Sequence, residues 1–409
     1  MKYIVYEDML IIRLSPTFPV RGTLLALAFT FLVSGLLLSQ KVQTYSDIDQ
    51  VVLGASSRET QTSEALADFI GKKFTSESDR SRAIYAWIVN NIKYDVANMY
   101  NITPYASSTD VVKDVLRQRK GVCMHYAELY AEVANRLGIL TLVVPGYTRQ
   151  NDAIDEVPHA WCATMIDGAW QLLDPTWGAG YLQNSKFVFQ LNDYFYRTPP
   201  VNLVKSHMPF DPMWQMLPQP VDHESFFAGT MPVAGNQPVF HFADTLQDYL
   251  GKSRTEQLQD AGRRIVKSGI SNPLMAEALR YNEQELVFIA QRGHIDLFND
   301  AVTSFNTAID GMNALVAYRN RQFTPAKSDN DLRAMADAVA DDFRKVRMQL
   351  EAIHPHAAES GPPVKELQGS LDEAEATFQM HATFVQKYLD TPEANRKALF
   401  QQSRSTGSR

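Results

Sequence analysis

Apolar and polar residues alternate in two different ways along this chain, and the change comes near residue 240. Before it, short stretches with a helical repeat are followed by short apolar runs typical of buried strands. A helix is predicted from residue 123 to about 137, because apolar residues recur at three- and four-residue steps from Tyr126 and Gly138 favours a helix end. An earlier helix is predicted to begin at Ser76, in a sequence that resembles a capping box.

The apolar runs after the second helix predict an antiparallel sheet. Three strands are predicted, at residues 140–144, 159–166 and 169–174. The dipeptide Asp167-Gly168 between the last two strands is a strong signal for a tight hairpin turn. The first part of the chain is therefore predicted to be an α+β domain in which helices pack on an antiparallel sheet.

The segment from 198 to 240 contains many prolines, which interrupt any long element. Trp214 and the pair Phe226-Phe227 predict that this segment packs back on the preceding domain. We therefore expect the first domain to span residues 41–240, with the proline-rich segment as its C-terminal extension.

Beyond this extension, apolar residues step by three and four over three long stretches, which predicts an antiparallel helical bundle at residues 241–395. A further helix, from about 273 to 292, is expected to join it, and residues 396–409 are expected to be a flexible tail. Asparagine occurs at every seventh position of the first long helix, at Asn299, Asn306, Asn313 and Asn320. The favoured interpretation is a polar flank of the helix seam. The alternative is a ladder that fixes register or binds an extended partner.

The composition is ordinary for a globular protein, with 45% apolar and 21% charged residues among 409. A net charge of −7 and the lack of a long basic run argue against a nucleic-acid surface. The chain has only two cysteines and needs no structural disulfide.

An uncharged, mostly apolar run at residues 22–38 follows Arg13 and Arg21. Such a sequence is typical of a signal peptide, and it is slightly short for a membrane span. We expect residues 1–40 to be a signal peptide or an N-terminal membrane anchor, and this segment to be the only contact with a membrane. The rest of the protein is then expected to be exported to the periplasm or the cell exterior.

Cys123, His159 and Asp174 supply a thiol, an imidazole and a carboxylate in chain order. A cysteine nucleophile needs these three groups, because the imidazole takes the thiol proton and the carboxylate orients the imidazole. Cys123 is predicted in the first turn of its helix, where free N–H groups favour a thiolate. The hairpin register places His159 beside Thr176, with Asp174 diagonal to it on the same face. The alternative for Cys123 is a buried structural cysteine.

Four further residues lie next to this triad or at strand ends, and we expect them to line a substrate cleft: His125, Tyr147, Trp161 and Trp177. The alternative is that each packs beneath the site. No cluster of metal ligands accompanies the triad in the sequence, so no metal and no cofactor are expected.

The ordered motifs Gly121-Val122-Cys123, Pro145-Gly146-Tyr147, His159-Ala160-Trp161 and Asp174-Pro175-Thr176-Trp177-Gly178 resemble the transglutaminase-like superfamily of papain-like cysteine enzymes. The resemblance is to the branch related to kyphoscoliosis peptidase, and it covers roughly residues 60 to 220. It continues through Ser206-His207-Met208-Pro209. It departs at Cys162, where asparagine is commoner in this branch.

The resemblance implies a cysteine-dependent acyl-transfer enzyme that acts on peptide or amide bonds of a protein or peptide substrate through a thioester on Cys123. Whether water or an amine receives the acyl group stays open. The bundle is expected to hold a protein partner at the cell envelope. The alternative function is a catalytically idle scaffolding or binding protein that works through its helical bundle.

Overall fold

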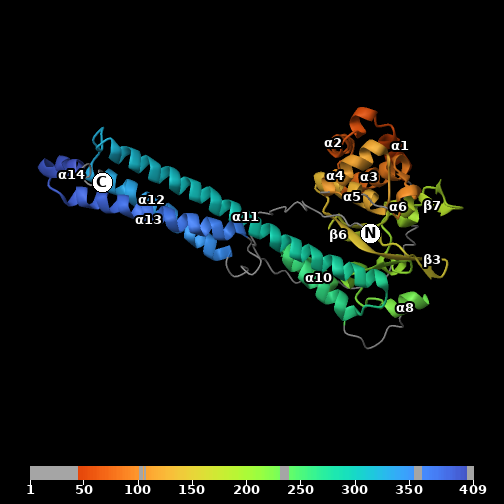
Figure 1. Ribbon diagram of the computed structural model, residues 1–409. Coiled ribbons are helices and arrows are strands. Elements are labelled where there is room, and N and C mark those ends of the chain that lie inside the picture. Colours follow the sequence, from red (N-terminus) through yellow and green to blue (C-terminus); the bar gives the residue numbers. More distant parts are fainter. Residues whose placement is uncertain (1–44, 101–104, 106, 231–238, 354–361, 403–409) are drawn as a thin grey trace, which may run out of the picture. The chain divides into compact units, whose positions relative to one another are not determined.

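A computed structural model describes residues 45–100, 105, 107–230, 239–353 and 362–402 (Figure 1). The chain forms two compact units that meet in sequence between Glu285 and Leu286. The apolar run at 22–38 lies outside the described residues. Of the helices that the structure describes, none combines the length and the apolar character needed to cross a bilayer.

The first unit consists of helices followed by a sheet and then by further short helices. Its helices are α1 (Ser46–Leu53), α2 (Ser63–Lys73), α3 (Glu77–Asn91), α4 (Ser108–Gln118), α5 (Cys123–Arg136), α6 (Pro175–Ala179), α7 (Pro200–Leu203), α8 (His223–Ala228), α9 (Phe242–Gly251) and α10 (Arg254–Ser268). Its strands are β1 (Lys93–Tyr94), β2 (Lys120–Gly121), β3 (Thr141–Gln150), β4 (Ala153–Ile154), β5 (His159–Ile166), β6 (Ala169–Leu173), β7 (Gly180–Gln183), β8 (Lys186–Phe189) and β9 (His207–Pro209).

The main sheet is antiparallel, with the strand order β4-β3-β5-β6, and β9 pairs with β3. The predicted hairpin is confirmed, because Ile166 pairs with Ala169 across a turn in which Asp167 and Gly168 have φ of 51° and 77°. The predicted helices are confirmed as α3 and α5, with Ser76 accepting a hydrogen bond from the Asp79 N–H at 3.0 Å.

The predicted register beyond Leu173 is wrong. The last β5–β6 pair is Cys162 with Leu173, because Pro175 begins helix α6 and Asp174 is its N-cap. His159 lies beyond this last pair, so it does not pair with Thr176. On the other side of β5, it pairs with Gly146 of β3.

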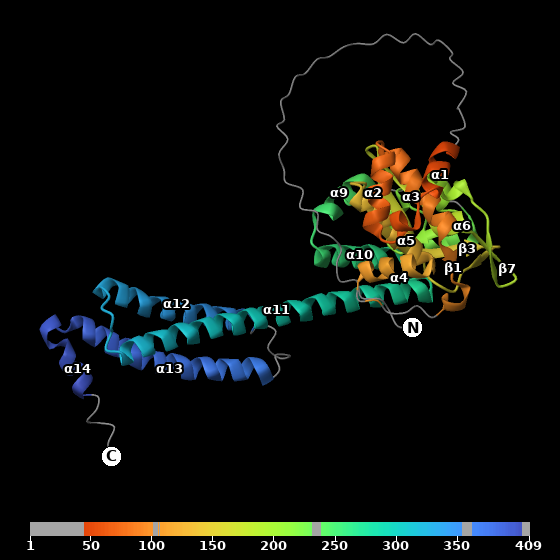
Figure 2. The ribbon, with the colours of Figure 1, turned by 90° about the horizontal axis from the view of Figure 1, so that it is seen from above.

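Both faces of the sheet are covered, which explains why every residue of β5 except Met165 is buried. Ala160, Cys162 and Ile166 pack with α2, α3 and α5 in one cluster, and α3 and α5 lie side by side over this face (Figure 2). Trp161 and Ala163 belong to a second cluster with Trp214 and with Leu246 and Tyr249 of α9. The proline-rich extension thus packs back on the sheet, as predicted.

The first unit also extends further along the chain than the predicted boundary at residue 240. Leu246 and Tyr249 of α9, Ile265 of α10 and Met275 are buried with residues of the sheet or its extension. The expected separate helix at 273–292 is instead the beginning of one long helix, α11 (Pro273–Asn320). The apolar faces of α9, α10 and the beginning of α11 complete the covering of the sheet. These elements therefore belong to the first unit and not to the bundle.

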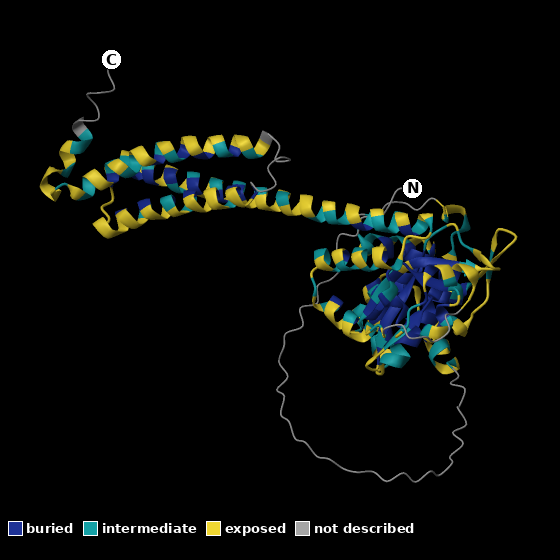
Figure 3. Ribbon diagram, turned by 90° about the horizontal axis from the view of Figure 1, so that it is seen from below, coloured by how far each residue is buried: buried dark blue, intermediate teal, exposed yellow. Residues whose placement is uncertain are grey.

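The second unit contains most of α11, together with α12 (Asp329–Ile353), α13 (Pro362–Asp390) and α14 (Arg396–Gln402). The predicted seams form one apolar core, seen as narrow buried stripes on these helices (Figure 3). The expectation of a flexible tail is wrong for residues 396–402, because Phe400 packs on Phe323 with a ring distance of 5.7 Å. Residues 403–409 lie outside the described part. The four repeated asparagines are all exposed, as a polar flank requires.

Candidate active site

Cys123 is the first residue of α5, so its backbone N–H has no partner within the helix, whereas the N–H groups of His125 and Tyr126 donate to the Val122 carbonyl oxygen. Its side chain is 8% exposed, and Sγ lies 4.0 Å from the carbonyl oxygen of Pro158, the residue before His159. Helix α5 packs on β5. The contact between the helix start and the strand start therefore brings the thiol to the imidazole.

His125 fixes the start of this helix. Its Nδ1 accepts a hydrogen bond from the Val122 N–H at 3.1 Å, and its Nε2 lies 3.0 Å from the Tyr105 hydroxyl. That hydroxyl donates to Asp114, so its oxygen is free to accept the Nε2–H of a neutral imidazole. Burial accordingly lowers the pKa of His125. A side chain at Gly121 would place its Cβ 2.5 Å from His125 Cβ, which explains the glycine before the cysteine.

His159 and Asp174 form a buried pair, with Nε2 2.7 Å from Oδ2. His159 lies at the first position of β5 and is 9% exposed, whereas Asp174 is fully buried. The remaining ring nitrogen, Nδ1, is left for another partner. Cys123 lies close enough to this imidazole to help raise the pKa of His159. The structure thus brings together the three residues that the sequence predicted.

Asp174 accepts four hydrogen bonds, two on each oxygen. Oδ1 accepts from the backbone N–H groups of Thr176 and Trp177 at 2.7 and 3.2 Å, as an N-cap of α6. Oδ2 lies 2.7 Å from His159 Nε2 and 3.0 Å from His207 Nε2. A buried carboxylate needs such partners to remain charged.

The pKa shifts match these contacts. Burial opposes a charge on His159, but the charge and hydrogen bond of Asp174, helped by Cys123, outweigh burial and raise the pKa of His159 to about 10. Burial also favours the neutral form of Asp174, but His159 and then His207 hold the pKa of Asp174 below its ordinary value. The pair is therefore an imidazolium and a carboxylate at neutral pH.

Three of the four predicted cleft residues pack beneath the site instead. Tyr147 is fully buried and bonds to His223, Trp161 is 1% exposed, and His125 caps a helix. The proline-rich extension covers the sheet residues Tyr147 and Trp161. Trp177 alone is half-exposed, with its ring 5.9 Å from that of His159.

His207 is a member of the site to which no role was assigned from the sequence, although the family resemblance includes it in Ser206-His207-Met208-Pro209. It lies in the proline-rich extension, where a histidine beside apolar Met208 and Phe210 is compatible with an ordinary buried strand. Only the pairing of β9 with β3 brings it to Asp174. The short apolar run after Ser206 could have indicated the strand that carries His207, because the run is strand-like despite its proline.

His159, Asp174 and His207 are also the one group of the described residues whose donor atoms lie close enough to hold a metal, within 4.8 Å of one another. Two imidazoles and a carboxylate would suit zinc chemically. Both imidazole nitrogens, however, are at hydrogen-bond distance from the same oxygen, and the residues are almost fully buried. Hydrogen bonding accounts for the arrangement without an ion.

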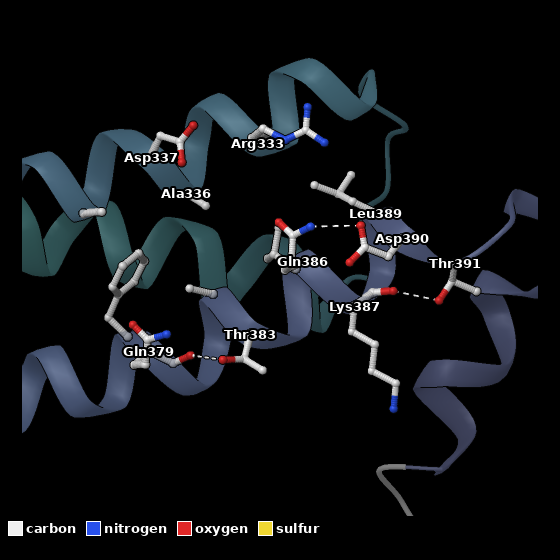
Figure 4. Close-up of a pocket in the computed structure, with 14 residues that line it drawn as sticks. Arg333, Ala336, Asp337, Gln379, Thr383, Gln386, Lys387, Leu389, Asp390 and Thr391 are labelled. Atoms are coloured by element: carbon white, nitrogen blue, oxygen red, sulfur yellow. Dashed lines mark hydrogen bonds between the residues drawn. The ribbon is translucent and has the colours of Figure 1, made fainter.

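The second unit has a hollow between α12 and α13, lined by side chains such as Arg333, Asp337, Gln386 and Asp390 (Figure 4). Gln386 donates to Asp390 of its own helix at 2.9 Å. The described lining residues include neither a cysteine nor a histidine. This hollow therefore offers polar contacts but no cysteine nucleophile.

Comparison with known proteins identifies the family of this part of the chain. Residues 64–175 match the transglutaminase-like superfamily. This chain carries a transglutaminase-like domain. The match begins at the N-terminus of α2 and ends just after Asp174, so it includes Cys123 and His159 but not His207.

Two relatives are kyphoscoliosis peptidases. The human protein is 32% identical over 171 residues, which are 40% of this chain and 25% of that protein. The protein of Mus musculus is 30% identical over 185 residues, which are 42% of this chain and 28% of that protein. The chain thus matches only about a quarter of the length of these relatives, and the similarity lies in the branch that the motifs indicated.

Among solved structures, the periplasmic domain of TgpA from Pseudomonas aeruginosa is similar at 25% identity and a TM-score of 0.24. The match covers 32% of this chain and 48% of that one.

Proposed function

We propose that this protein is an exported cysteine-dependent acyl-transfer enzyme that acts on peptide or amide bonds. The observation that carries the proposal is the 2.7 Å contact between His159 Nε2 and Asp174 Oδ2, with Cys123 beside the same imidazole at a helix start. The transglutaminase-like superfamily, which residues 64–175 match, contains cysteine enzymes with the order cysteine, histidine, aspartate. This match supports the proposal.

The chemistry follows from the three groups. The Cys123 thiolate attacks the carbonyl carbon of the substrate, and the backbone N–H of Cys123 at the start of α5 is available to the oxyanion. The C–N bond then breaks, the amine leaves with the proton held by His159, and a thioester remains on Cys123. Water gives a carboxylic acid and a second amine gives a new amide, and His159 takes the proton of either acceptor.

The test is labelling of the full chain with an iodoacetamide-alkyne, followed by assay on a mixture of peptides and primary amines. We expect Cys123 to be labelled and a peptide to be cleaved or joined to an amine. The replacement Cys123→Ala should abolish both results. Turnover that persists in this variant would refute the proposal.

Export is a separate part of the proposal, and it rests on the apolar run at 22–38. Fusion of a periplasmic reporter enzyme to the C-terminus should give an active reporter in a bacterial host. Deletion of residues 1–40 should abolish it. An active reporter without this segment would contradict a role of the segment in export.

A second candidate function is a binding protein that works through its bundle, favoured by the polar hollow between α12 and α13. It predicts that Arg333→Ala together with Asp390→Ala would weaken a partner complex and that Cys123→Ala would not. The candidate fails if Cys123 is needed for the protein's effect on its partner.

A further inference from the structure

His207 reaches the candidate site from outside the matched family domain. The match ends at residue 175, and β9 follows it by about thirty residues of chain that include a hairpin and three short helical segments. The three residues of β9 pair with Gly146, Tyr147 and Thr148 of β3. The pairing places His207 opposite Thr148, two residues from Gly146, which itself pairs with His159.

The contacts of His207 are specific at both ring nitrogens. Nε2 lies 3.0 Å from Asp174 Oδ2, and Nδ1 lies 2.8 Å from the Ser206 hydroxyl. If the hydroxyl donates to Nδ1, the proton of a neutral ring is on Nε2 and points at the carboxylate. Burial lowers the pKa of His207 against the pull of Asp174, which is consistent with this neutral ring.

Aromatic side chains hold the ring in place on several sides. The ring centroid of Trp177 lies 4.5 Å away, that of Trp161 5.2 Å and that of Phe195 5.9 Å. His207 itself is 1% exposed. A ring packed in this way cannot turn away from Asp174 without moving its neighbours.

We propose that His207 is a positioning residue, which donates its Nε2–H to the Asp174 oxygen that also binds His159 and thereby fixes both the direction and the charge of that carboxylate. The inference rests on the proposed function and extends it to a segment outside the family match. His207 does not touch the substrate in this account, and it acts through Asp174 on His159.

Two effects follow when His159 and His207 both donate to the same oxygen, Oδ2 of Asp174. The carboxylate is fixed on both oxygens, so His159 Nε2 has one direction to bond and its Nδ1 is directed to Cys123. The second donor also takes up part of the negative charge of Oδ2, which would otherwise act on His159 alone. Loss of the His207 donor is therefore expected to loosen the pair and to make His159 harder to deprotonate.

Several other titratable groups surround these imidazoles. Cys123 and Asp174 act on His159, and Asp174, His159 and Asp155 act on His207. The tyrosines that sense Asp174 have raised pKa values and stay neutral: Tyr85, Tyr94 and Tyr126. The group expected to lose its proton in the mildly alkaline range is thus His159.

The test compares His207→Leu, which removes the donor, with His207→Gln, whose amide N–H can replace Nε2–H. A matched control is His223→Leu, another buried histidine of the same unit, which bonds to Tyr147 and not to Asp174. The readout is the rate of alkylation of Cys123 by iodoacetate between pH 5 and 10 in the full chain. An imidazolium beside the thiolate attracts this anionic reagent, so the alkaline limb of the profile reports His159.

In His207→Leu we expect the maximal rate to fall about tenfold, as for other small displacements of reacting groups, and the alkaline limb to move to higher pH. His207→Gln should restore both toward the wild type, and His223→Leu should leave both unchanged. A wild-type profile in His207→Leu, or equal defects in the leucine and glutamine variants, would overturn the proposal.

A leucine variant that fails to fold still leaves two decisive variants. Ser206→Ala removes the partner of Nδ1, and it should give a smaller change in the same two directions. A wild-type profile in Ser206→Ala would overturn the proposal, because the partner of Nδ1 would then have no effect on the donor at Nε2 or on His159. If the wild type shows no alkylation of Cys123 at any pH, the proposed function fails before this inference is reached.

Discussion

Gly146 of β3 and Met208 of β9 approach so closely that a Cβ built on Gly146 would lie 2.3 Å from the Met208 carbonyl oxygen. It would also lie 2.8 Å from Pro209 Cα and 2.5 Å from the Trp161 ring. Backbone atoms cannot move aside as a flexible side chain can. The absence of a side chain at Gly146 therefore allows β9 to lie where His207 reaches Asp174.

The replacement Gly146→Ala is expected to push β9 away from β3. We expect a loss of about 1–3 kcal/mol in the free energy of unfolding, as for other overpacked positions. The alkylation rate of Cys123 should fall as well, because His207 moves with β9. Urea unfolding and the iodoacetate assay measure the two effects. The control is Gly251→Ala, where an added Cβ meets no atom within 4 Å. Equal stability of the two variants would show that the contact does not constrain β9.

The elements that carry Cys123 and His159 could be predicted from the sequence because each is specified locally. The helix face of α5 and the Asp167-Gly168 turn depend on residues a few positions apart, and the structure has both. The pairing of His159 with Asp174 was predicted from an extended hairpin. The structure reaches it by a different route, because Pro175 ends the strand and Asp174 caps α6.

The missed features depend on contacts between distant residues. Tyr147 was expected in a cleft, but Phe210 and Phe226 from the extension cover it. The same extension supplies His207. No short-range pattern shows which sheet face a proline-rich segment will cover, so this part of the site could not be derived from local signals. The apolar seam of the bundle was predictable. The assignment of the beginning of α11 to the first unit was not, because the helical repeat of α11 continues from one unit into the other.

The ion pair of His159 and Asp174 should make stability depend on pH in two directions. His159 has a raised pKa of about 10 against an ordinary value of 6.5. Its contribution is therefore complete below about pH 6.5, declines as the pH rises, and is lost above about pH 10. The lowered pKa of Asp174 gives a contribution that is present above its ordinary value of 3.8 and is lost in acid.

The measurement is the free energy of unfolding of the wild type and of His159→Gln at pH 6, 8 and 10. We expect the difference between the two proteins to shrink steadily from pH 6 to pH 10. A difference that is constant or that grows with pH would show that His159 is not held as an imidazolium by Asp174.

A buried arginine is expected to hold the helical part of the first unit together. Arg82 is 1% exposed and bonds to both oxygens of Asp49 on α1, at 2.8 and 2.6 Å, and to Asp193 after β8 at 2.5 Å. Arg82→Ala leaves Asp49 without its partner and should cost about 3–5 kcal/mol, as for other broken buried pairs. Thermal unfolding measures this cost. The exposed pair of Lys72 and Asp68 is the control, and Lys72→Ala should cost less than about 1 kcal/mol.

The second unit should fold without the first, provided that the fragment is cut where the structure divides the chain. Residues 286–409 contain the whole of its apolar core. We expect a helical circular dichroism signal that melts cooperatively, and a lower melting temperature in Phe400→Ala, because Phe400 packs on Phe323 and Tyr388. A fragment that shows no cooperative melt would mean that the bundle needs the first unit.

The three residues of the triad should differ in their effect on turnover. Cys123→Ala and His159→Ala are expected to abolish activity on any amide substrate, because nucleophile and base act as one unit. Asp174→Asn should retain a small part of it, since the amide can still occupy the position that orients His159. Steady-state kinetics on the substrate found in the peptide screen give the comparison. Equal losses in all three variants would mean that Asp174 does more than orient the base.

The most direct test of the account is selective labelling of the two cysteines of the native chain. Cys123 lies at a helix start beside His159, whereas Cys162 is fully buried, with Sγ 3.5 Å from the Ala127 carbonyl oxygen. Iodoacetate at pH 6, followed by mass spectrometry of peptides, measures the rate at each cysteine. We predict rapid labelling at Cys123, none at Cys162, and a large fall at Cys123 in His159→Ala. Labelling of Cys123 at the same rate with and without His159 would contradict the central claim that the two residues form a reactive pair.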